Sequence, residues 1–207
     1  MNGLRSESGD FKWRCGVAMM CGMLYQIISL LLEVATGILA GACLLRLYMQ
    51  HQRIAMSARS GNPLGGFVFA LTDWLVLPLR RVLPAIGRLD TASLVAAYLV
   101  ELLQFVLLWL LAGANRSLLA LPLLAFFGLL HLIISGLTGL VIVYAVMSWM
   151  PTRSIISDVI ERLCAPLLAP IRRVLPLIGG IDLSPLALLL LLQIVSIMLG
   201  YLQAGLL

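Results

Sequence analysis

Two pairs of adjacent arginines lie inside the same proline-bounded pattern. Arg80-Arg81 and Arg172-Arg173 are each surrounded by the order Pro-x-Arg-Arg-x-x-Pro-x-x-Gly-x-x-Asp. A guanidinium group is planar and can donate two parallel hydrogen bonds to a phosphate. The four arginines are therefore candidates for binding anionic lipid headgroups or a partner protein. The alternative interpretation is a topological anchor that only keeps these loops inside the cell.

The two patterns are copies of each other. At a constant offset of 92 residues, nine of the thirteen positions of 78–90 and 170–182 are identical. A shared apolar bias does not produce matched proline, arginine, glycine and aspartate, so we infer an internal duplication. Each half contains a span, a loop with the motif and a second span. An even number of crossings gives both halves the same orientation, which defines a parallel repeat.

Each motif ends in an aspartate that directly precedes an apolar run. Asp90 is therefore expected to cap the helix of the second span, and either Asp182 or Ser184 is expected to cap that of the fourth. The alternative is that the two aspartates pair with the arginines of their own motif. The prolines at both ends of 78–84 are expected to prevent a regular helix through the arginine pair.

The composition requires lipid as the solvent for most of the chain. Of 207 residues, 62% are hydrophobic and only 11% are charged, and the mean hydropathy is +1.08. A soluble domain of this size has too little interior for so much apolar surface. The net charge is +5, but the basic residues form no run, so we expect no direct nucleic acid binding. The cysteines lack metal-ligand spacing and are expected to be small apolar residues, without a disulfide or a metal (Cys15, Cys21, Cys43 and Cys164).

The apolar runs predict an all-α membrane protein with about four transmembrane helices in two parallel-repeat halves. The expected spans are about 24–46, 92–112, 124–144 (within the run 118–150) and 186–206. The organisation is a polar tail (1–14), a first repeat (15–112), a short turn (113–117) and a second repeat (118–207).

A shorter apolar segment precedes each arginine pair. Residues 64–77 are too few to span a bilayer, which is typical of interfacial or re-entrant segments. Residues 155–169 alternate between an apolar and a polar face, as in a helix that lies in the headgroup plane. Each half is therefore expected to place an amphipathic helix on the membrane surface just before its Pro-Arg-Arg loop.

Four polar side chains fall near the middle of the expected spans. They are Glu33, Glu101, His131 and Gln193, and Gln193 is the counterpart of Glu101 at the offset of 92. Ionisable groups in hydrocarbon are expensive and often functional. The four could meet in one interior cluster, as a structural network or as a proton or cation path. Haem ligation within one chain is not expected, because the chain has only two histidines.

The doubled motif resembles the YggT/YlmG family of small integral membrane proteins. The second copy is the more similar one, with Asp182-Leu183-Ser184-Pro185 after the motif and Ser148-Trp149-Met150-Pro151 before it. The first copy departs from the family pattern at Thr91-Ala92-Ser93 and at Gln52-Arg53. Relatives of this family are associated with osmotic-stress tolerance, the bacterial division cluster, plastid nucleoids and cytochrome haem assembly. The resemblance implies a membrane organiser or assembly factor and assigns no chemistry.

Two function classes remain open. The leading hypothesis is a non-enzymatic organiser of the bacterial inner membrane that acts through its cytoplasmic surface helices and arginine pairs. Its expected partners are anionic headgroups, an unidentified membrane protein and a second copy of the chain. The alternative is an oligomeric channel or transporter component that uses the intramembrane Glu/His/Gln cluster. No nucleophile–base pair, metal-ligand spacing or phosphate-binding glycine loop points to an enzyme, and no cofactor is expected.

The positive-inside rule predicts that both motif loops face the cytoplasm and both termini face outside. The loops 47–91 and 151–183 carry nine basic residues, against four in the N-terminal tail and the 113–117 turn. Single cysteines introduced at Ser57 and Ser154, in a background without other cysteines, should resist an impermeant maleimide in intact cells. Ready labelling of either position would reverse the orientation.

Overall fold

The chain is built from six α-helices in the part that the structure describes. The computed structural model describes residues 4–54, 63–83, 90–113, 118–148, 154–174 and 182–206. No strand occurs within these ranges. The helices are α1 (Leu4–His51), α2 (Pro63–Val82), α3 (Thr91–Leu111), α4 (Leu121–Ser148), α5 (Ile155–Val174) and α6 (Ser184–Leu206), and a short 3₁₀ helix (Leu118–Ala120) leads into α4.

Four segments are long and apolar enough to cross a membrane, which confirms the predicted fold class. They are Gly22–His51, Thr91–Leu111, Leu118–Ser148 and Ser184–Gly205. Only 17–28% of the residues in their most apolar windows are buried inside the protein. Outward-facing side chains such as Leu30 and Ile194 therefore need a hydrocarbon solvent. The first span differs from expectation in being the C-terminal part of a longer continuous helix.

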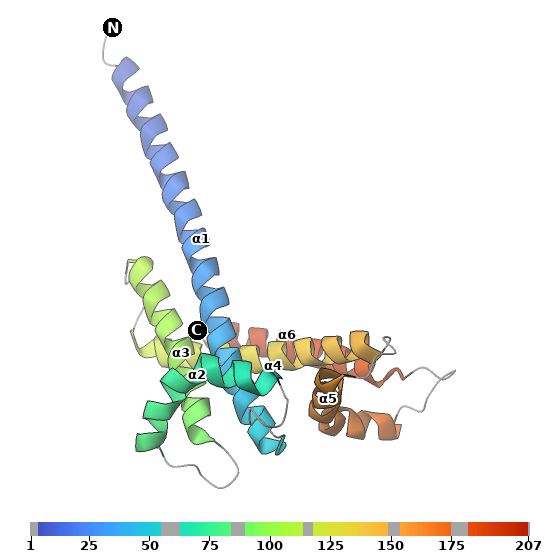
Figure 1. The fold of residues 1–207 in the computed structure, drawn as a ribbon. Coiled ribbons are helices and arrows are strands. Elements are labelled where there is room, and N and C mark those ends of the chain that lie inside the picture. Colours follow the sequence, from blue (N-terminus) through green and yellow to red (C-terminus); the bar gives the residue numbers. More distant parts are fainter. Residues whose placement is uncertain are drawn as a thin grey trace.

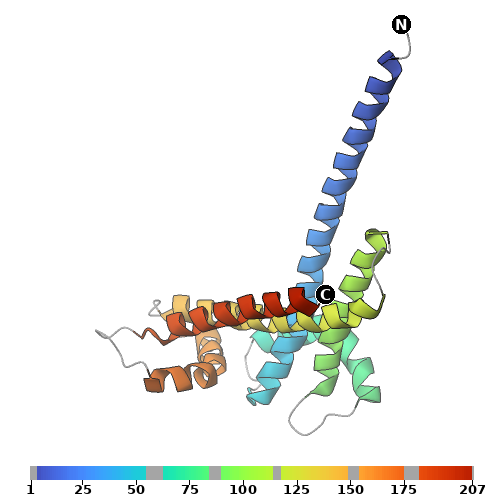
Figure 2. The same cartoon turned by 180° about the vertical axis from the view of Figure 1, so that it is seen from behind.

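The helices of each half have the same mutual contacts. α1 projects away from the rest of the molecule, and α3 lies beside its C-terminal part (Figure 1). α4 and α6 run side by side, at a steep inclination to the α1–α3 pair, and α3 also packs against α4 (Figures 1 and 2). α2 contacts both α1 and α3, and α5 contacts both α4 and α6. Each half is thus two long helices with a shorter helix that touches both.

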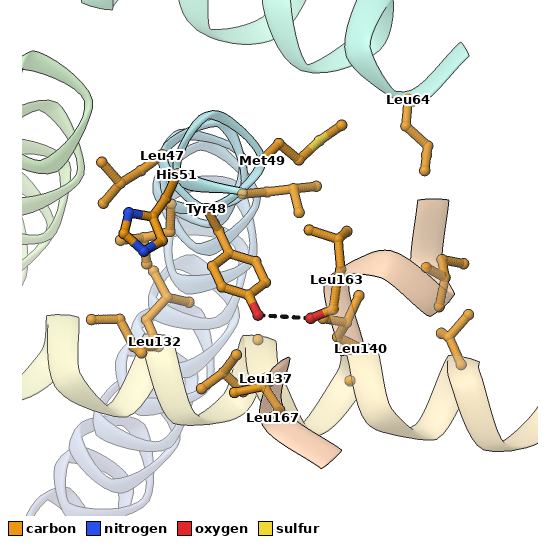
Figure 3. A pocket seen from close by; sticks show the side chains of 18 of the residues that line it. Leu47, Tyr48, Met49, His51, Leu64, Leu132, Leu137, Leu140, Leu163 and Leu167 are labelled. Carbon is orange, nitrogen blue, oxygen red and sulfur yellow. Dashed lines mark hydrogen bonds between the residues drawn. The ribbon is translucent and has the colours of Figure 1, made fainter. Parts of the chain in front are cut away.

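The core is divided in the same way. One apolar cluster joins α1, α2 and α3 and also includes Leu129 of α4, and a second joins α4, α5 and α6. A third cluster connects the end of α1 to α5 through Met49, Ile54 and Leu163. The Tyr48 hydroxyl donates a hydrogen bond to the Leu163 carbonyl at 2.7 Å, beside an apolar cavity of about 640 Å³ (Figure 3). The C-terminal end of α1 therefore joins the first half to α5 of the second half, in addition to the contact between α3 and α4.

The expectation that proline interrupts the helix at the arginine pairs is wrong. α2 continues through Pro78 to Val82, and α5 continues through Pro166 and Pro170 to Val174. All three prolines are exposed, on the side away from the core. Proline removes one backbone hydrogen bond, and at an exposed site water can bond the carbonyl that it leaves free. Burial of the opposite apolar face holds these segments helical, so the arginine pairs form the last helical turn rather than a loop.

A buried arginine anchors α2 to α1. Arg46 is only 2% exposed, and its Nη1 lies 2.7 Å from Asp73 Oδ1 and 2.8 Å from Thr72 Oγ1. Its guanidinium also lies over the Phe69 ring, 4.6 Å from the centroid. Three residues within little more than one turn of α2 thus contact one side chain of α1.

Replacing Asp73 by asparagine should loosen α2, because Arg46 would keep a buried charge without its carboxylate. A hydrogen bond to a charged group contributes about 1.5–3 kcal/mol, and we expect the lower end because Asp73 is 42% exposed. Amide hydrogen exchange in α2 should quicken accordingly. Asp158→Asn on α5 is the matched control, since Asp158 is exposed and has no ion pair among the described residues. Unchanged exchange in α2 would show that Arg46 does not hold this helix.

Candidate functional site

The first motif forms a contact between three helix ends. Arg80, in the last turn of α2, is ion-paired with Asp90, the residue before α3, through Nη2 and Oδ2, and its Nε lies 3.4 Å from Oδ1. Asp90 is 5% exposed, and the Ser93 hydroxyl donates to it at 2.8 Å. With its amide oriented to suit both partners, Gln50 in α1 donates to Asp90 at 2.9 Å and accepts from Arg80 at 3.0 Å. Gln50, Arg80 and Asp90 are called the first clamp.

The second motif forms the corresponding contact. Arg172 in the last turn of α5 lies 2.8 Å (Nη2) and 3.0 Å (Nε) from Asp182 Oδ2. Its Nη2 also donates to the Tyr144 hydroxyl in α4 at 2.8 Å. Tyr144, Arg172 and Asp182 are called the second clamp. In both halves the clamp connects the shorter helix (α2 or α5, called the surface helix below) to the end of the preceding long helix and to the start of the next one.

The two roles considered for the motif aspartates are distributed differently in the two halves. Both aspartates pair with the first arginine of their own motif. Asp182 also accepts a hydrogen bond from the Ser184 backbone N–H at 2.9 Å, so it caps the first turn of α6 as well. Asp90 lies at the cap position of α3 but makes no side-chain bond to the helix backbone. Ion pairing is therefore the role that both halves share.

The two arginines of each pair are not equivalent. Arg80 and Arg172 are held in the clamps. Arg81 and Arg173 are exposed, and neither has a hydrogen bond or an ion pair to any residue that the structure describes. Each of these helices thus ends with one guanidinium paired with the protein and one that has no partner among the described residues. The proline and glycine positions in the middle of each motif lie outside the described residues.

The clamps favour ionised aspartates. Burial alone would raise the pKa of the Asp90 carboxyl, but hydrogen bonds from Arg80 and Ser93 and the Arg80 charge hold it below its ordinary value of 3.8. At Asp182, burial also acts to raise the pKa, and it is outweighed by hydrogen bonds from Ser184 and Arg172. Both carboxylates are therefore charged at neutral pH.

The four intramembrane polar residues are not gathered at one point. Glu101 is buried where α3 packs between α1 and α4, whereas Glu33, His131 and Gln193 are exposed. The His131 Nε2 lies 3.4 Å from the Ser196 hydroxyl, which connects α4 to α6. Within the described ranges, no hydrogen bond or ion pair joins any two of the four. The acids belong to the α1–α3 pair, and His131 and Gln193 belong to the α4–α6 pair.

Three side chains of this region were not predicted as site residues from the sequence. Gln50 and Tyr144 join the clamps from helices distant in the chain. Arg46 looks like an ordinary charge at the end of a span until its burial is known. The one signal for Tyr144 is that the Leu47-Tyr48 and Val143-Tyr144 pairs each lie near the end of a first span.

The cysteines that the structure describes behave as apolar residues. Cys43 and Cys164 are buried free thiols, as expected. Burial raises the pKa of the Cys164 thiol to about 11, despite the opposing charge of Arg172. A thiol with so high a pKa is unreactive at neutral pH. The side chains of Cys15 and Cys21 lie outside the described part, as does Ser57.

Comparison with known proteins finds relatives that match most of this chain. The family profile described as CCB3/YggT matches residues 22–111 and 123–203, regions that correspond to the two halves. A protein of Escherichia coli (strain K12), "Uncharacterized protein YggT", is 38% identical over 174 residues, 82% of this chain and 85% of that protein. A Vibrio alginolyticus protein described only by its place in the proC 3' region is 35% identical over 177 residues, 84% of this chain and 93% of that protein. No solved structure matches.

The clamps predict a specific acid sensitivity. Because the pKa of each aspartate is lower in the folded protein than its ordinary value, its stabilisation is complete above that value and is lost as the pH falls through the folded pKa. At neutral pH, Asp90→Asn combined with Asp182→Asn should lower the free energy of unfolding by roughly 2 kcal/mol for the buried Asp90. The contribution of Asp182 should be smaller, since both partners of that pair are partly exposed.

The measurement is the unfolding midpoint of wild type and double variant in nanodiscs across the acid range. The difference between the two proteins should stay constant down to a pH of about 4 and shrink below it. Glu161→Gln, at an exposed position on α5, should change nothing. A difference that persists unchanged in strong acid would exclude the ionised aspartates as its source.

Proposed function

The chain belongs to the CCB3/YggT family, and from that premise we propose that it is a non-enzymatic organiser of the bacterial inner membrane. It acts through α2 and α5, which lie on the cytoplasmic face and contact anionic lipid headgroups. A role in osmotic-stress tolerance or in organising the cell envelope is part of the proposal. The similar proteins of Escherichia coli and Vibrio alginolyticus support a bacterial setting.

The observation that carries the proposal is that the two arginines of each pair differ in their contacts: the first forms an ion pair within the protein and the second does not. One arginine of each pair is used to fix the surface helix, so the direction of the next side chain is also fixed. Arg81 and Arg173 are then held in an exposed position at the end of a docked helix. A topological anchor needs only charge in the loop, and it requires no such fixed geometry.

The surface helices have the character that headgroup binding requires. In α5, Ile160, Leu163 and Leu168 are buried against the bundle, whereas Glu161 and Arg162 are exposed. In α2, Val68 and Val76 are buried, and Phe67 and Trp74 are exposed. Trp is favoured at the headgroup level of a bilayer. Each helix thus offers an apolar side to the protein and a mixed side to the interface, with an arginine at its end.

Replacing Arg81 and Arg173 by glutamine should weaken binding of anionic lipid and leave the fold intact. An arginine near an anionic surface contributes about 1 kcal/mol, so the affinity of each half should fall about five-fold. The measurement is the number of phosphatidylglycerol molecules retained by the purified protein, counted by native mass spectrometry as that lipid is titrated against phosphatidylcholine. Lysine at both positions keeps the charge without the planar fork and should give an intermediate result.

The matched control exchanges the other arginine of each pair. Arg80→Gln with Arg172→Gln removes the same charge but breaks both clamps, so its main effect should be a lower unfolding midpoint. Equal lipid retention in wild type and in the Arg81/Arg173 variant would contradict the proposal and leave these arginines as topological anchors. Selective capture of an acidic protein by the same two arginines, without lipid retention, would also contradict it.

A further inference from the structure

Glu101 of α3 is a buried carboxyl group. It lies near the middle of the apolar α3 segment and is 5% exposed. None of the residues that the structure describes donates a hydrogen bond to its carboxylate or forms an ion pair with it. The proposed role of the surface helices makes no use of this side chain.

The surroundings of Glu101 are polar on one side only. Glu33 of α1, also near the middle of its span but exposed, is close enough for its charge to act on Glu101. One turn further along α3, Gln104 is 8% exposed and its Oε1 accepts a hydrogen bond from the Thr36 hydroxyl of α1. The α1–α3 contact thus contains a buried acid, an amide and a hydroxyl, and a second, exposed acid lies on α1.

On the side of α4, the Glu101 carboxyl group lies against a glycine. A Cβ at Gly128 of α4 would lie 2.9 Å from Glu101 Oε2 and 2.8 Å from the Phe105 ring. The Glu101 carboxyl therefore occupies space that any other residue at position 128 would fill. This close approach fixes the carboxyl group between three helices instead of letting it extend to the membrane surface.

An isolated pair of ionised carboxylates is not sustainable at this depth. Removing a charge from water into hydrocarbon without a partner costs several kcal/mol. Two like charges near each other add to that cost, as in carboxyl pairs that share one proton. The helices around α3 offer no cation to Glu101 among the described residues: Arg46 of α1 and Arg80 of α2 are engaged in their own ion pairs, Arg81 is exposed at the end of α2, and His131 of α4 lies against Ser196.

We propose that Glu101, with Glu33 beside it, is a proton-binding site in the middle of the membrane. Glu101 carries the proton and is a neutral acid at neutral pH. The site occurs once per chain, because Gln193 replaces the acid at the corresponding position of the second half. An amide in that place keeps the size and polarity of the side chain but cannot release a proton.

The test is reaction with dicyclohexylcarbodiimide, an apolar reagent that attacks protonated carboxyl groups from within the bilayer. The full-length protein in nanodiscs at neutral pH should acquire one stable adduct on Glu101, located by peptide mass spectrometry. A water-soluble carbodiimide should leave Glu101 unmodified and react instead with exposed acids such as Glu161. Glu101→Gln should abolish the adduct.

Two further variants test whether the labelling of Glu101 depends on its surroundings and not only on access of the reagent from the bilayer. Glu33→Gln should reduce the labelling of Glu101, because the neighbouring carboxyl that keeps the proton there is gone. Gly128→Ala should also reduce it by displacing the carboxyl group. Both variants are compared with wild type by circular dichroism to establish equal helix content.

The wild-type protein alone can overturn the proposal. Absence of the adduct in the folded protein would show that Glu101 is ionised or inaccessible from the bilayer. Equal reaction with the water-soluble reagent would show an aqueous cavity instead of a proton-binding site in hydrocarbon. Neither result bears on the arginines of the surface helices, so the two proposals fail separately.

Discussion

An arginine and an aspartate ten residues apart meet in each half of the molecule, and that contact joins the end of one helix to the start of the next. A surface helix has only one face with which to pack, so packing alone leaves its far end free to move. The Arg80–Asp90 and Arg172–Asp182 pairs fix that end to the start of the next span. Gln50 and Tyr144 then join the end of the preceding long helix to the same point. One charged contact in each half thereby sets the relative position of three elements, and it also determines which arginine is left exposed.

The parts of this architecture that the sequence could predict are those that depend on local composition. The spans could be predicted from hydropathy, because a helix that crosses the hydrocarbon core needs about 20 predominantly apolar residues. Pairing of Asp90 with its own motif was one of two alternatives, since both roles place the carboxylate near the start of a helix. The course of α2 through Pro78 was not predictable from proline's preference, because tertiary burial of Val68 and Val76 outweighs the lost hydrogen bond. The roles of Gln50 and Tyr144 could not be predicted for a different reason. Their partners are distant in the chain, and no sequence spacing marks a glutamine or a tyrosine as the partner of an ion pair.

The two halves share a framework but differ inside it. The clamps are repeated, as are the contacts of each surface helix with its two long helices. Apart from the clamp aspartate, the buried ionisable groups of the first half, Arg46 and Glu101, are not repeated in the second. At the offset of 92, the positions of Thr72 and Asp73 are taken by Cys164 and Ala165, and the position of Glu101 by Gln193. Buried charge is costly, so the two halves differ in the charge that they bury and not in the framework that surrounds it.

The short separation within each clamp has a consequence for biogenesis. A loop of about ten residues closes in roughly 10–100 ns, whereas a ribosome adds about 5–20 residues per second. Once the aspartate has been synthesised, the chain has ample time to find its arginine before the following span is complete. The first surface helix can therefore be fastened while the second half of the protein is still being made, and insertion of the later spans begins from an already ordered neighbour.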